Sequence, residues 1–137
     1  MGMWAFAPWD NDEAADWYGD FMEETRFRNA WLKGIDADAE DSPDTVRAAA
    51  ALFVTLGRVY IWPITTYEQD LERAIAALSK VASSNTYQQV PELRDMIAQE
   101  IAELKGRRKK RWQRLRSSSS IRIQVLVAVL VRPRLVV

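Results

Sequence analysis

Apolar residues recur at spacings of three and four along four stretches of this chain of 137 residues. Such spacing places them on one face of a helix, and each stretch opens with residues typical of a helix start. The four starts are at Asp10, Ser42-Pro43-Asp44, Thr66 and Pro91. No strand-like alternation occurs before Ser117, and the connections are short. The chain is therefore predicted to be all-α, a small bundle of about four helices.

A tryptophan-rich segment, residues 1–17, leads into the first predicted helix. Asp10 is the expected N-cap, and Glu13 three residues later completes a capping box. We expect a single helix that fades near Trp31 to Gly34. Its apolar face contains Ala14, Trp17, Tyr18, Phe21 and Met22. Because so much apolar surface is unfavourable in water, we expect this segment to pack on the bundle as a core plug rather than to frame an aromatic ligand pocket.

The net charge of zero hides two oppositely charged parts. Residues 1–106 contain 19 acidic and nine basic side chains, whereas residues 107–137 contain ten basic side chains and no acidic one. The net charges are therefore −10 and +10. Such asymmetry is typical of chains with a basic interaction tail. The predicted division is a helical domain over residues 1–116, followed by a Ser-rich linker and an apolar, basic tail over residues 117–137.

Cysteine and histidine are both absent from the chain. Without cysteine there is no disulfide, thiolate nucleophile or thiolate metal ligand. Without histidine the chain lacks the commonest general base and the commonest metal ligand. We therefore expect a non-catalytic protein with no cofactor, metal or small-molecule ligand. Because no secretory signal leads the chain, we expect a cytoplasmic location.

Clustered acidic residues are the first candidate binding feature. Asp12, Asp16 and Asp20 would line one strip of the first helix at spacings of four. Asp36 and Asp38 lie in the acidic loop that follows. The first cluster does not fit a calcium-binding loop, because the required glycine and the final glutamate are missing. A solvated surface is the simpler interpretation, and docking of a basic protein partner is the functional one.

A basic segment with an interleaved tryptophan is the second candidate. It reads GRRKKRWQRLR over residues 106–116. Its candidate binding residues are Arg107, Arg108, Lys109, Lys110, Arg111, Trp112 and Arg114. Such a segment can bind nucleic-acid phosphates or an anionic membrane. The simpler interpretation is a continuation of the fourth helix to about Arg116, with a basic outer face that pairs with the acidic body.

The last residues, 117–137, contain four serines followed by a β-prone apolar run. The uncharged part of this run, from Val125 to Val131, is too short to cross a membrane as a helix. The tail is predicted to be irregular or β-prone. A native strand-forming segment, a disordered tail and the product of a frameshift all stay open, and the other reading frames of the coding DNA distinguish the last of these.

The opening residues also follow a wider pattern, M-G-x-W-G-x-G-x-F-D-N-D-x-A-x-D-W or -F. The residues that fit it are Met1, Gly2, Trp4, Asp10, Asn11, Asp12, Ala15, Asp16 and Trp17. In this the chain resembles a bacterial family of small proteins, domain of unknown function 4259, over roughly residues 1–116. Ala5 and Ala7 stand where the family has glycine, and Trp9 where it has phenylalanine. The resemblance implies no particular activity.

Together these features predict a non-catalytic module for protein–protein interaction, with an acidic surface for a basic protein partner. An immunity protein that neutralises a toxin is one concrete version of this hypothesis. The alternative is binding to nucleic acid or to an anionic membrane through residues 107–116.

Overall fold

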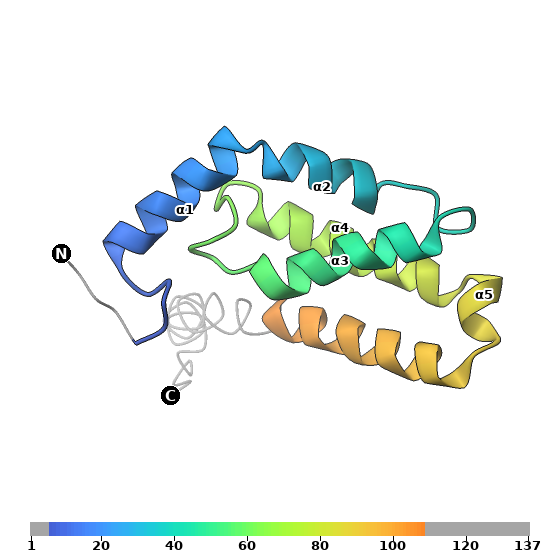
Figure 1. Ribbon diagram of the computed structural model, residues 1–137. Helices are drawn as coiled ribbons and strands as arrows, with labels where there is room; N and C mark the ends of the chain where they lie inside the picture. The colour runs from blue at the N-terminus through green and yellow to red at the C-terminus, as the bar shows by residue number, and fades with distance from the viewer. Residues whose placement is uncertain (1–5, 109–137) are drawn as a thin grey trace, which may run out of the picture. The chain divides into compact units, whose positions relative to one another are not determined.

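The computed structural model describes residues 6–108, which contain six helices and no strand (Figure 1). The helices are α1 (Asp12–Glu24), α2 (Phe27–Ile35), α3 (Pro43–Leu56), α4 (Tyr67–Ala82), α5 (Asn85–Gln88) and a last helix over residues 91–108. This confirms the all-α prediction. In the part of the chain that is described, no helix combines the length and the apolar character needed to cross a membrane.

The centre of the core lies between α3 and α4, and α2 packs against both. Most residues of the predicted apolar stripes are buried, namely Val46, Ala49, Ala50 and Phe53 from α3 and Leu71, Ala74, Ile75, Leu78 and Val81 from α4. Ile97 and Leu104 from the last helix are buried as well. Leu56 and Ala82 at the ends of the α3 and α4 stripes are partly buried, and Met96 in the stripe of the last helix is exposed. Helices α2 and α3 approach closely at Gly34, where an added Cβ atom would lie 3.1 Å from the Cβ atom of Ala49. Complete burial of one valine, leucine or isoleucine side chain contributes about 1.5–3 kcal/mol to the free energy of unfolding.

The first helix is capped one residue later than predicted. Asn11 is the N-cap of α1, and its Oδ1 atom accepts a hydrogen bond of 2.8 Å from the backbone N–H of Ala14. Asp10 instead accepts from the N–H of Ala7, at 3.3 Å. The predicted capping box of Asp10 and Glu13 is therefore wrong. Asn and Asp are equally good caps, so their order in the chain did not identify which one caps the helix.

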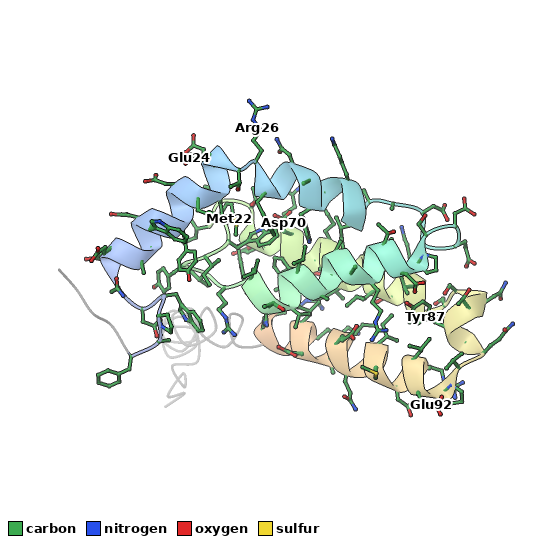
Figure 2. The ribbon with its side chains drawn as sticks, viewed as in Figure 1. Met22, Glu24, Arg26, Asp70, Tyr87 and Glu92 are labelled. Atoms are coloured by element: carbon green, nitrogen blue, oxygen red, sulfur yellow. The ribbon has the colours of Figure 1, made fainter. Side chains whose placement is uncertain are left out.

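The expected unbroken helix is in fact two helices, because the chain turns between α1 and α2. Arg26 has a φ of 50°, in the left-handed region. This conformation costs a residue with a side chain about 1–2 kcal/mol. Just before it, the Thr25 hydroxyl donates to the Phe21 carbonyl at 2.6 Å, which helps to close the end of α1. The bend is visible in Figure 1, and Figure 2 shows Arg26 pointing away from the bundle.

The predicted core plug is confirmed for Trp9 and wrong for Trp17. Trp9 packs against the edge of the core, and the guanidinium of Arg58 lies 4.4 Å from the centre of its ring. The side chain of Trp17 is 59% exposed and that of Phe6 is 99% exposed, while Trp4 lies outside the described residues. Helix residues are rotated by about 100° from one to the next, so Trp17 points roughly 140° away from the buried Met22.

Polar contacts attach α5 and the last helix to α3. The buried Tyr87 of α5 donates a short hydrogen bond to the carboxylate of Asp44, and its burial and this bond raise the pKa of Tyr87. Arg47 donates two hydrogen bonds to Glu100 of the last helix, the shorter at 2.7 Å. The short helix α5 was not predicted, because four residues are too few for an apolar periodicity to show.

Candidate functional site

A carboxylate with no solvent exposure, that of Asp70 in α4, lies inside the bundle (Figure 2). Arg28 of α2 donates to both of its oxygens, from Nε to Oδ2 at 2.7 Å and from Nη2 to Oδ1 at 2.8 Å. The indole Nε1 of Trp62 donates to Oδ2 at 2.8 Å. Burial favours the neutral acid, but the hydrogen bonds from Arg28 and Trp62 outweigh it, so the pKa of Asp70 lies below its ordinary value.

This carboxylate has a structural role. Both of its oxygens already accept hydrogen bonds, so it is poorly placed to move a proton to or from a substrate. It connects α2 and α4 to residues 57–66, the segment between α3 and α4. Trp62 in this segment also makes edge-to-face contacts with Phe27, Trp31 and Phe53. The Asp70 pair and the aromatic cluster therefore hold the segment in place.

Asp70 is not among the site residues predicted from the sequence, although the sequence contains a signal for it. Asp70 lies four residues before Ala74 and eight before Leu78, and both of these are fully buried. Residues at this spacing share one face of a helix. An acidic residue on the buried face of α4 indicates a hydrogen-bonded or paired carboxylate, because an unpaired charge in a core is strongly unfavourable.

The predicted acidic strip forms an exposed row along α1. We define the acidic row as Asp12, Asp16, Asp20 and Glu24, each four residues from the next and each exposed. All six charged residues of α1 are acidic. Within the described part of the chain, neither Asp16 nor Asp20 forms an ion pair. Three of the five predicted acidic candidates thus lie together on one surface.

The other two acidic candidates, Asp36 and Asp38, lie beyond the far end of α2 from this row (Figure 1). Asp36 forms an ion pair of 2.9 Å with Arg73. The Asp38 carboxylate accepts from the backbone N–H groups of Asp41 and Glu40, which lowers the pKa of Asp38. A hollow of about 670 Å³ lies beside them, lined by side chains of both charges. Asp36 and Asp38 already have partners within the protein, so their carboxylates are not available to a ligand. The hollow beside them is therefore a poor candidate for a binding site.

A second hollow, of about 470 Å³, lies between α1 and residues 57–66. Its lining is mainly apolar and includes Ala15, Gly19 and Met22 from α1 and Val59, Tyr60 and Ile64 from the segment. The side chain of Ile64 is 67% exposed. Trp62 lines this hollow as well, so its hydrogen bond to Asp70 helps to fix the wall opposite α1.

Helix geometry places the acidic row between two exposed apolar features. Residues three and four apart are neighbours on a helix surface, so the acidic row lies beside Ala15 and Gly19, which line the hollow. On its other side the row adjoins Trp17 and Phe21, whose rings stack with centres 5.3 Å apart. Both rings are exposed. We call the hollow, the acidic row and the Trp17–Phe21 pair together the α1 face.

The predicted basic patch is only partly described. Arg107 and Arg108 are helical and half-buried. Lys109, Lys110, Arg111, Trp112 and Arg114 lie outside the described residues. As for metals, no group of His, Cys, Asp or Glu between residues 6 and 108 is arranged to hold an ion.

The function of the α1 face is inferred from the charges and apolar surfaces of its own residues, because the comparisons with known proteins give no guide to it. The resemblance of residues 1–116 to domain of unknown function 4259 stays a prediction. No family model matches the chain, and neither a curated protein nor a solved structure matches it.

Proposed function

We propose that this protein is a non-catalytic, cytoplasmic interaction module that binds a basic and apolar segment of a protein partner on its α1 face. The observation that carries the proposal is the exposed acidic row between the hollow and the Trp17–Phe21 pair. Neutralisation of a toxin is one version of this function.

The acidic row favours a cationic partner for two physical reasons. Carboxylates four residues apart on a helix repel each other by about 0.2–0.5 kcal/mol per pair, and a bound Lys or Arg would relieve this repulsion. Opposite charges also accelerate association and select against acidic partners. Charged surfaces of this kind contribute more to specificity and to the association rate than to affinity, so apolar contacts must supply a large part of the affinity.

The apolar features beside the acidic row would supply that affinity. Trp17 and Phe21 form a stacked, exposed aromatic pair, and the hollow on the other side offers further apolar surface. Aromatic side chains are enriched among the residues that dominate binding energy at protein interfaces. A Lys or Arg over the exposed indole of Trp17 would add about 0.5–1 kcal/mol.

Reversing two charges of the acidic row tests the proposed function. The probe is a synthetic peptide of leucine and lysine in an amphipathic helical repeat, about 18 residues long so that it can form a helix. We expect Asp16→Lys/Asp20→Lys to weaken its binding by about tenfold or more, which corresponds to about 1.4 kcal/mol. Isothermal titration calorimetry at low salt and at about 0.15 M salt measures this loss, which should shrink as salt screens the charges.

The matched control is Glu40→Lys/Asp41→Lys, which changes the net charge equally in the exposed loop beyond α2. Its effect should be small, because this loop follows the end of α2 that is opposite to α1 (Figure 1). Equal weakening by both double variants would show attraction to overall charge only and would contradict the proposal.

A further inference from the structure

We infer that the hollow over Gly19 receives one large apolar side chain of the partner, and that the partner segment is therefore an amphipathic basic helix. This inference rests on the proposed function and adds to it the place and the chemistry of the apolar anchor.

Gly19 is the first observation behind this inference. It lies in the middle of α1, where glycine costs about 1 kcal/mol relative to alanine. Its backbone is ordinary, since no described glycine has a positive φ. Apart from its chain neighbours and the backbone of α1 itself, no described atom lies within 4 Å of the position that a Cβ atom would take. Neither helix geometry nor internal packing therefore requires glycine here, whereas close approach of a bound group would.

The walls of the hollow point to an apolar group. Met22 and Ile64 offer aliphatic surface on opposite sides of it, and Tyr60 adds an aromatic ring. The volume of about 470 Å³ lies within the usual range for ligand pockets, about 300–1,000 Å³. Small-molecule sites combine an apolar lining with a few polar groups that converge on the ligand and orient it. The one charged residue among the described residues that line this hollow is Glu23, on the α1 side, so a converging polar set is missing and an aliphatic or aromatic side chain of a basic segment fits the lining better than a small polar molecule does.

The acidic row explains why the segment that carries this side chain should be a basic helix. The row extends for about 18 Å along α1, at 1.5 Å per residue. Cations four residues apart on a partner helix have the same spacing as the carboxylates of the row. An apolar residue three positions from such a cation would lie on the neighbouring strip of the partner helix, as the hollow lies beside the row. A second copy of α1 is disfavoured, because it would bring a second acidic row against the first.

Filling the hollow from within tests the inference. In Gly19→Leu the new side chain has open space around its Cβ atom, so the fold should persist, and a thermal melt checks this. We expect this variant to bind the leucine–lysine peptide at least about tenfold more weakly than the natural chain does. Ile64→Ser removes one wall of the hollow and should weaken binding in the same direction. A peptide with alanine at every leucine position should bind both the natural chain and Gly19→Leu weakly and equally.

The outcomes separate this inference from the proposed function. Unchanged binding of the leucine–lysine peptide to Gly19→Leu and to Ile64→Ser, with loss in Asp16→Lys/Asp20→Lys, would overturn the inference and leave the proposed function standing. If Gly19→Leu weakened the binding of the alanine peptide as much as that of the leucine–lysine peptide, the loss would not depend on apolar side chains of the peptide. This result would overturn the inference that the hollow receives such a side chain. Absence of saturable binding to the natural chain would overturn both.

Discussion

Replacing Asp70 with alanine should lower the free energy of unfolding at pH 7 by about 3 kcal/mol. Removal of one partner from a buried ion pair typically costs about 3–5 kcal/mol, because the other charge is left without compensation. Here the side chain of Arg28 keeps 24% of its exposure, so water can partly solvate it and the lower end applies. The change also leaves the indole N–H of Trp62 without its acceptor. Urea unfolding followed by tryptophan fluorescence measures the difference.

The pH dependence of the stability lost in Asp70→Ala shows whether the loss comes from the ionised carboxylate or from packing. Because the folded-state pKa of Asp70 lies below its ordinary value of 3.8, the ionised carboxylate stabilises the fold above that value. This contribution is lost as the pH falls through the folded-state pKa. The gap in stability between the natural chain and Asp70→Ala should therefore narrow below about pH 4. Asp70→Asn, which keeps the size and one acceptor oxygen, should cost less at pH 7. A gap that stays constant down to low pH would assign the effect to packing alone.

Replacing Gly57 with alanine should lower the free energy of unfolding by about 2–3 kcal/mol, the upper part of the range for an overpacked site. Gly57 is buried at the C-cap of α3, where its N–H donates to the Phe53 carbonyl at 2.7 Å. An added Cβ atom would lie 2.3 Å from that carbonyl oxygen and 2.8 Å from the Phe53 ring. Both are too close, so the chain must move at the start of the segment that walls the hollow. Thermal or urea unfolding measures the loss.

Gly19→Ala is the matched control for this substitution. It adds the same methyl group within α1, where the space around it is open. It should stabilise the protein by up to about 1 kcal/mol, through the higher helix propensity of alanine. Similar destabilisation by both substitutions would contradict the steric explanation given for Gly57.

The helices of the central core could be predicted because their signals are local. Apolar spacing identified the buried faces of α3 and α4, and Pro43 and Pro91 marked two helix starts correctly. The contact between Arg28 and Asp70 joins residues 42 positions apart, so no local pattern announces it. The break at Arg26 lacks the glycine or proline that usually marks one.

The acidic residues of the candidate site could be predicted from the sequence, but the solvent exposure of its aromatic side chains could not. The spacing of Asp12, Asp16 and Asp20 gave the acidic row directly. The apolar pattern around Trp17 shows that α1 is amphipathic, but whether a neighbour covers that side depends on the direction in which α1 leaves the bundle. The turn at Arg26 separates α1 from α2, and the segment that lies opposite α1 across the hollow, residues 57–66, is distant from α1 in the sequence.

The turn at Arg26 also has a consequence for local stability. Of the residues of α1, Met22 alone is buried, whereas α4 buries seven. Segments with little buried surface open without global unfolding, so the amide hydrogens of α1 should exchange with solvent faster than those of α3 and α4. A ligand that binds only folded α1 would slow this exchange and raise the free energy of local opening. Binding of a partner would then be thermodynamically coupled to the folding of α1.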